Sequence, residues 1–169
     1  MTITPAVKEE MIVIGMGEIA VSREPSSVLT CLGLGSCIAL CAYDPVTRVG
    51  GMVHIVLPES NISNTEQSPA KYADTAVPFL IEQMARHNAI KTRLVVKIAG
   101  GAQMSLASGL LGAFKTGERN VEMVLSCLEK ERISVSGIDV GGNKGRTVQL
   151  YPATGKVTTR SAGEQPREL

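Results

Sequence analysis

The most informative stretch of this sequence is residues 37–57, CIALCAYDPVTRVGGMVHIVL. Cys37–Tyr43 and Gly50–Leu57 are short apolar runs of the kind found in strands. The segment between them, Asp44–Arg48, contains Asp-Pro followed by Thr-Arg and is typical of a turn. The stretch therefore predicts a β-hairpin, which brings side chains from two separate runs to one end of a sheet.

The same signals continue on both sides of the hairpin. Runs bounded by glycine, proline or aspartate predict further strands at Met11–Ile14, Ile19–Ser22, Val28–Cys31, Arg93–Ala99, Ile133–Val140, Arg146–Tyr151 and Lys156–Arg160. A helix is predicted with Ser68 as its cap and Pro69 at its first position, and helical spacing continues it through to about His87: Ala73, Ala76, Val77, Leu80, Ile81 and Met84. Pro78 removes a hydrogen bond inside that run, so we expect a kink or a second helix start near Thr75.

A second helix is predicted with Asn120 as its cap and one apolar face: Val121, Val124, Leu125 and Leu128. Roughly eight strands and two helices do not alternate as a doubly wound fold requires. The runs therefore predict a mixed sheet or a β-sandwich, with helices packed on one side. Residues 1–160 are predicted to form a single domain, and residues 161–169, which contain Pro166, a flexible tail.

Composition excludes several classes of protein. Of the 169 residues 44% are hydrophobic and 20% charged, with a net charge of +1, so no basic field is available for nucleic acid. The sequence lacks a run of about 20 apolar residues for membrane insertion and begins without a signal-peptide pattern, which predicts a cytoplasmic protein. Free thiols are then the expected state of the four cysteines, whose spacing matches no zinc module; we expect no metal or cofactor.

Two glycine motifs resemble nucleotide-binding loops. Gly15-Met16-Gly17 follows a predicted strand, but the chain continues as an extended segment where a dinucleotide site requires a helix. Gly141–Arg146 lacks the Gly-Lys-Ser/Thr ending of a phosphate loop. We interpret the first as a turn between strands and the second as a tight hairpin connection.

A third glycine-rich segment, Leu32–Cys37, ends on a cysteine. Backbone N–H groups gathered at such a turn lower the pKa of a thiol, and those of Ser36 and Cys37 are candidates to hold an oxyanion. His54, across the predicted hairpin, is a candidate base for Cys37. On these residues alone, two other interpretations remain open beside a catalytic pair: Cys37 as an inert buried cysteine and His54 as a core histidine.

The wider sequence resembles the chemoreceptor glutamine deamidases, the CheD family. The resemblance rests on ordered motifs that span about residues 11 to 157: Leu32–Cys37, Gly50–Pro58, Lys71–Asp74, Lys97–Met104, Gly117–Asn120, Gly141-Gly142 and Gly145-Arg146. It implies an α/β (α+β) sandwich with mixed, largely antiparallel sheets and about two main helices, similar to papain-like and bacterial-toxin cysteine amidases. It also implies a cysteine-dependent protein-glutamine glutaminase, with Cys37 as nucleophile and His54 as general base and acid.

By the same resemblance, the substrates are glutamines on cytoplasmic helices of chemoreceptors, and some members also hydrolyse glutamate methyl esters. The usual partner is a CheC-type phosphatase of the response regulator. The polar loop Glu59–Ser68 and the segment Gly100–Gly117 are candidate rims of the cleft.

The third member of the family's catalytic triad does not carry over directly. The family places a threonine six residues before the cysteine, where this sequence has Cys31. Thr30 is adjacent but points to the opposite face of a strand, unless a bulge turns it inward. The group that orients His54 is therefore open among Cys31, Thr30 and a backbone carbonyl.

Two other functions compete with deamidation. One is a non-catalytic adaptor that binds and stimulates a CheC-type phosphatase, and the departure at Cys31 favours it. The other is a redox sensor that uses Cys31 and Cys37, which lie on either side of a glycine turn.

Overall fold

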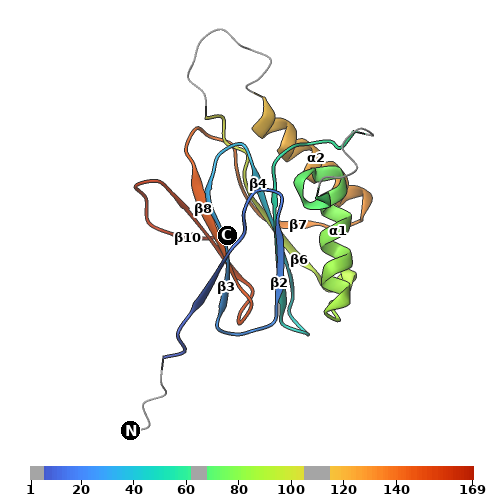
Figure 1. Ribbon diagram of the computed structural model, residues 1–169, viewed down its shortest axis with the longest axis vertical. Helices are drawn as coiled ribbons and strands as arrows, with labels where there is room; N and C mark the ends of the chain where they lie inside the picture. Colours follow the sequence, from blue (N-terminus) through green and yellow to red (C-terminus); the bar gives the residue numbers. More distant parts are fainter. Residues whose placement is uncertain (1–5, 62–67, 105–114) are drawn as a thin grey trace.

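A computed structural model describes residues 6–61, 68–104 and 115–169, which form three layers (Figure 1). The strands are β1 (Glu10–Val13), β2 (Ile19–Ser22), β3 (Ser27–Leu34), β4 (Ile38–Asp44), β5 (Val49–Ile55), β6 (Val95–Gly100), β7 (Val135–Val140), β8 (Arg146–Tyr151), β9 (Lys156–Ser161) and β10 (Arg167–Glu168). The helices are α1 (Ala73–Arg86) and α2 (Thr116–Lys130), with short 3₁₀ turns at η2 (Pro69–Lys71) and η3 (Lys91–Arg93).

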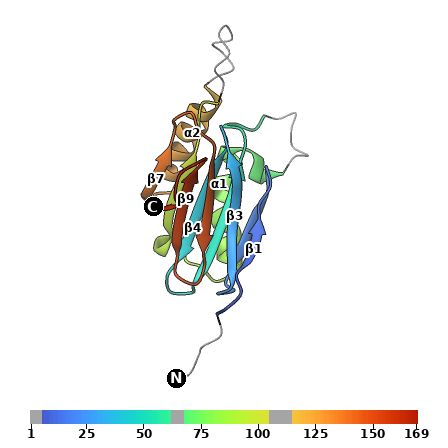
Figure 2. The same ribbon diagram turned by 90° about the vertical axis from the view of Figure 1, so that its left-hand side faces the viewer.

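The strands divide into two five-stranded sheets. One has the order β1-β3-β8-β9-β10 and the other β2-β5-β4-β6-β7. Only β1–β3 and β6–β7 pair in parallel among the described strands. Figure 1 shows α1 and α2 together on the outer side of the second sheet, and Figure 2 shows the first sheet with β3 and β9 in front of β4. The predicted α+β sandwich with helices on one side is confirmed.

The β4–β5 hairpin lies at the centre of the molecule. Ala39 pairs with His54, and Asp44 pairs with Val49 at the turn. Because successive side chains of a strand point to opposite faces, one set of hairpin side chains faces the helices and the other faces the first sheet. A register slip of one residue would exchange the two sets.

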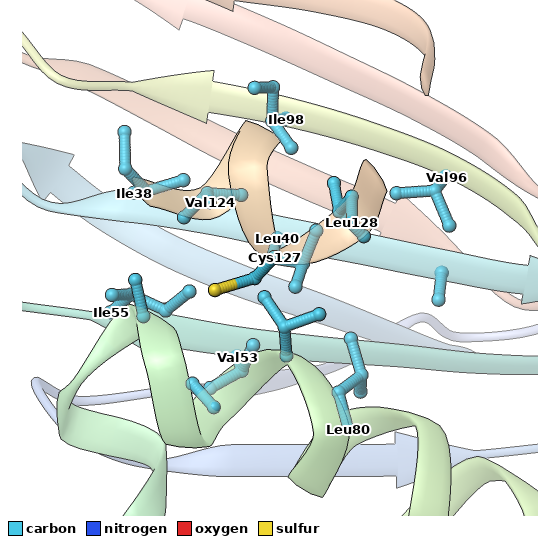
Figure 3. Close-up of a cluster of buried hydrophobic side chains, with 14 of the residues drawn as sticks. Ile38, Leu40, Val53, Ile55, Leu80, Val96, Ile98, Val124, Cys127 and Leu128 are labelled. Carbon is cyan, nitrogen blue, oxygen red and sulfur yellow. The ribbon is translucent and has the colours of Figure 1, made fainter. Parts of the chain in front are cut away.

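The helix-facing set forms the larger core. Figure 3 shows apolar side chains of the sheet and the helices directed toward one another: Ile38, Leu40, Val53, Ile55, Leu80, Val96, Ile98, Val124, Cys127 and Leu128. Gly51 allows α1 to approach, because a Cβ there would lie 2.5 Å from the sulfur of Met84. Burial of these side chains fixes the helices on the second sheet.

The other set packs between the two sheets. This core contains Ala39, Cys41 and Met52 of the hairpin against residues of β3, β8 and β9 such as Leu29 and Val148. His54 has the parity of Met52, so its side chain also lies on the face toward the first sheet.

Several boundaries differ from those predicted. Ser68 caps the turn η2 through a 3.2 Å bond from Ala70 N–H, and α1 then runs from Ala73 through Pro78 without a second start at Thr75. Asn120 is not the cap of the second helix: α2 begins at Thr116, so Asn120 lies one turn inside it and is fully buried.

Two segments toward the C-terminus also differ from their predicted structure. Gly141–Gly145 is not a hairpin, because β7 belongs to the second sheet and β8 to the first. Glycine turns and apolar periodicity do not specify which sheet a following strand joins. The segment 161–169, predicted to be a flexible tail, contains β10, which pairs with β9, and Lys97 Nζ donates to the Leu169 carbonyl at 2.6 Å. Within the described residues, neither helix is long and apolar enough to cross a membrane.

Candidate active site

A cavity of about 520 Å³ opens at the end of the β4–β5 hairpin, opposite its turn. Its walls are Val13–Met16, Leu32–Cys37, His54 and Met104. The two sheets meet here, so the cavity continues the inter-sheet core outward to solvent. Cys37 and His54, which the sequence singled out, line the same space.

Cys37 directly precedes β4 and is half-buried. It lies two residues before Ala39, which pairs with His54, so both side chains occupy the same face of the sheet as diagonal neighbours. Burial raises the pKa of the Cys37 thiol. The sequence predicted the opposite direction from the N–H groups of the loop, but the loss of solvent around the sulfur has the larger effect.

His54 is buried and fixed at three points. Its backbone N–H donates to the main-chain carbonyl of Glu18 at 3.0 Å, and its own carbonyl accepts from the N–H of Gly17 at 2.9 Å. Its ring Nδ1 lies 3.0 Å from the Ile14 carbonyl oxygen. A carbonyl only accepts, so Nδ1 is the donor in this pair, and the tautomer with its proton on Nδ1 presents Nε2 as an acceptor.

Ile14 is itself held in place by β3. Its N–H donates to the carbonyl of Thr30 at 2.8 Å, which continues the parallel pairing of β1 with β3. The Thr30 hydroxyl instead donates to the Val28 carbonyl at 3.2 Å. The structure thus connects Thr30 to His54 through the main chain of Ile14.

The bulge that would turn Thr30 inward is absent at that position. Thr30 pairs in register with Gln149, and the irregularity in the β3–β8 pairing falls later, between Cys31 and Leu34. It exposes Leu32 and Gly33 at the edge of the cavity.

Cys31 is on the inner face of β3. Its thiol is fully buried, 3.4 Å from the sulfur of Met52. Burial, and to a smaller extent the nearby Cys37, raises the pKa of Cys31 to about 12. A thiol in this state is an apolar neighbour of the site.

The loop before Cys37 is anchored through three successive carbonyls. Gly35 accepts from Ala102 N–H at 2.8 Å, Ser36 from Asn120 Nδ2 at 2.8 Å, and Cys37 from Gly101 N–H at 2.9 Å. Every peptide bond here is trans, so each following N–H points away from the bonded carbonyl. The N–H groups of Ser36 and Cys37 are therefore directed away from Ala102 and Asn120.

The described lining of the cavity contains no aspartate, glutamate, lysine or arginine. Met16, Leu32 and Met104 at its edge are more than half exposed. Among the described residues, no three histidine, cysteine or acidic side chains are placed to hold a metal ion.

Comparison with known proteins gives a consistent result. The family model described as CheD chemotactic sensory transduction matches residues 56–161. The chain belongs to the CheD family. The chain is 42% identical over 157 residues to the probable chemoreceptor glutamine deamidase CheD of Symbiobacterium thermophilum, covering 92% of this chain and 95% of that protein.

Another relative is the chemoreceptor glutamine deamidase CheD of Thermotoga maritima, 44% identical over 151 residues, or 89% of this chain and 92% of that one. A third, the probable chemoreceptor glutamine deamidase CheD of Desulforamulus reducens, is 43% identical over 152 residues, covering 89% and 90%. Among solved structures, the hypothetical protein YfiH of Bacillus licheniformis aligns over 83% of this chain and 61% of its own, with a TM-score of 0.43 and 9% identity.

Sequence reasoning left one group at the site of this CheD-family protein unidentified and missed another. A backbone carbonyl was among the predicted partners of His54, but no residue type signals that it belongs to Ile14. Asn120 does have a signal, because it is an asparagine in a motif shared with the family, but its common use as a helix cap concealed its contact with Ser36.

The two segments predicted to form the rim of the cleft fall partly outside the described residues. Within the second of them, Gly100–Gly117, Met104 lines the cavity. Residues 62–67 of the first and 105–114 of the second lie beyond the described ranges.

Proposed function

We propose that this protein is a chemoreceptor glutamine deamidase that uses Cys37 as its nucleophile. One observation carries the proposal: Cys37 and His54 share a cavity, and the Ile14 carbonyl holds the Nδ1 proton of His54, so that Nε2 is free to act as a base. The family membership and the names of its relatives supply the substrate class, glutamine side chains of chemoreceptors.

In the proposed reaction, His54 Nε2 takes the proton of Cys37 as sulfur attacks the carbonyl carbon of the glutamine amide. The raised pKa of the thiol fits a neutral Cys37 that loses its proton during attack. The C–N bond then breaks as His54 gives the proton to the departing nitrogen, which leaves as ammonia, and a thioester remains on Cys37. Water, deprotonated by His54, cleaves the thioester to glutamate and restores the thiol.

The oxyanion of the tetrahedral intermediate is held by the N–H groups of Ser36 and Cys37. Their orientation away from Ala102 and Asn120 supports this role. The candidates for the group that orients the base were Thr30, Cys31 and a backbone carbonyl, and the contact of His54 with the Ile14 carbonyl supports the third.

The absence of charged side chains in the described lining also supports an amide substrate. A neutral carboxamide enters a cavity lined mainly by apolar side chains at lower cost than a carboxylate. The product glutamate is charged, so the same environment favours its release.

The test incubates the protein with a cytoplasmic receptor fragment and follows amide-to-acid conversion at each glutamine by mass spectrometry. Cys37→Ala is expected to reduce conversion to the uncatalysed level. Cys127→Ala, which removes a buried thiol of α2 far from the cavity, is the matched control and should retain activity. Equal conversion by wild type and Cys37→Ala would overturn the proposal and leave the adaptor function.

Two finer proposals follow from the resemblance to the family. The first is hydrolysis of glutamate methyl esters, which passes through the same thioester with methanol as the leaving group; a methylated receptor fragment tests it. The second is a cytoplasmic complex with a CheC-type phosphatase, for which titration of the purified pair by calorimetry is the test. Absence of ester cleavage, or of binding, would contradict each one separately.

A further inference from the structure

Helix α2 places one buried amide against the ends of both catalytic strands. Asn120 is fully buried, and its Nδ2 donates to the Ser36 carbonyl at 2.8 Å and to the Val56 carbonyl at 2.9 Å. Ser36 directly precedes Cys37, and Val56 follows His54 by two residues. The two hydrogens of a single NH₂ group thus connect the chain at the nucleophile to the chain at the base.

Glycines make this close approach possible. A Cβ at Gly117, in the first turn of α2, would lie 2.6 Å from the Gly101 carbonyl oxygen. A Cβ at Gly101 would lie 2.5 Å from Val121 of α2, and one at Gly100 would lie 2.1 Å from the Cys37 carbonyl oxygen. Any side chain at these positions would push α2 or the Cys37 loop outward.

The amide is not optimised for stability. Asn120 Oδ1 is buried and has no hydrogen-bond partner among the described residues. A buried acceptor without a partner destabilises the fold, which offsets much of what the two bonds of Nδ2 contribute. The two carbonyls that Nδ2 fixes explain a polar side chain at this position better than a gain in stability does.

We propose that Asn120 is a positioning residue for the Cys37–His54 pair. By fixing the Ser36 carbonyl it sets the plane of the Ser36–Cys37 peptide, and therefore the direction of the Cys37 N–H toward the oxyanion. By fixing the Val56 carbonyl as well, it keeps the ends of β4 and β5 together. The role in the oxyanion site rests on the proposed deamidase function.

The test compares Asn120→Ala with Val124→Ala, one turn further along α2, buried in the same helix but packed only into the apolar core. Asn120→Ala should lower kcat for deamidation by about 10²-fold and change KM little, because an oxyanion donor acts mainly in the transition state. Val124→Ala should lower the thermal midpoint at least as much while retaining kcat. Equal kcat in the two variants would overturn the proposal.

A milder substitution and a second readout keep the two proposals separate. Asn120→Ser retains one donor and should lie between wild type and Asn120→Ala in kcat. The second readout is the rate at which iodoacetamide alkylates Cys37, which can be measured without a substrate. Asn120→Ala should change this rate, and Val124→Ala should leave it unchanged. If Asn120→Ala changes the rate of Cys37 alkylation but neither the wild type nor any variant deamidates the fragment, the deamidase proposal fails and the positioning role stands. If Asn120→Ala leaves the rate of alkylation unchanged, the positioning role fails.

Discussion

The two ends of the β4–β5 hairpin use buried polar groups in opposite ways. At the turn, Asp44 is fully buried and accepts hydrogen bonds from Val46, Thr47, Ile90 and Arg93, so its carboxylate is surrounded by donors. At the other end, the buried amide of Asn120 keeps one unsatisfied oxygen, and a thiol and an imidazole face a cavity. Satisfied polar groups stabilise the closed end, whereas the open end retains groups with capacity to react.

The two ends of the hairpin also differ in how burial affects the pKa of their ionisable groups. Burial alone would raise the pKa of Asp44, but Arg93 and the backbone N–H groups of Ile90, Val46 and Thr47 hold it well below its usual range. At the open end, burial raises the pKa of Cys37 without a compensating donor. The Asp44 carboxylate is therefore charged at neutral pH, whereas the Cys37 thiol keeps its proton there.

The largest effect is expected at the open end, from loss of the base. His54→Ala should reduce kcat/KM for deamidation of the receptor fragment by about 10³-fold. The chain has two histidines, and His87, at the end of α1, supplies the matched control. Mass spectrometry of the fragment checks both variants, and a comparable loss in His87→Ala would argue against a specific role for His54.

A backbone change sharpens the comparison within the open end. Gly100→Ala places a Cβ against the Cys37 carbonyl at a φ of +118°, so we expect about 3 kcal/mol of destabilisation and a displaced nucleophile. Gly163→Ala has a similar positive φ, +79°, with open space around it, and should cost about 1 kcal/mol. Urea unfolding measures the loss in free energy of unfolding for both variants. Equal losses would show that the contact with the Cys37 carbonyl is unimportant.

At the closed end, Asp44→Asn should lower the free energy of unfolding by about 2 kcal/mol near neutral pH while deamidation persists. Because the folded state lowers the pKa of Asp44, its contribution is complete above the ordinary aspartate value of about 3.9 and is lost as the pH falls below it. The stability gap between wild type and Asp44→Asn, measured by urea unfolding, should therefore narrow below about pH 4. A gap that stays constant with pH would mean that the charge is not what stabilises the turn.

The smallest effect is expected away from both ends. Glu82 and Arg86 form an exposed ion pair on α1 at 2.6 Å. Glu82→Gln should change the free energy of unfolding by less than about 0.5 kcal/mol, since solvent screens the pair. A loss as large as that of Asp44→Asn in the same unfolding experiment would contradict the contrast between buried and exposed charges.

The hairpin could be predicted from sequence because its signals are local: strand-forming runs flank an Asp-Pro turn. Cys37 and His54 were singled out mainly by the resemblance to the CheD family. The strand that carries His54 is buried on both faces, so its apolar pattern does not set the face of His54. Ile14 could not be predicted as the partner of His54, since it acts through its carbonyl and through a parallel pairing of β1 with β3.

Asn120 illustrates a different limit. Asparagine is common at helix starts, so its place before an apolar stripe predicted a cap. The helix begins four residues earlier because Gly117 lets its first turn pack against Gly101 and Ala102, a tertiary contact that local propensity does not encode.

The most direct test of the central claim, that His54 activates Cys37, is the rate of thiol alkylation in the folded protein. Iodoacetamide at neutral pH, followed by peptide mapping, should label Cys37, which is half-buried and lines the cavity, before Cys31, Cys41 and Cys127, which are buried. His54→Ala should slow labelling of Cys37 about tenfold, and His87→Ala should leave it unchanged. Equal labelling rates in the two histidine variants would contradict the account.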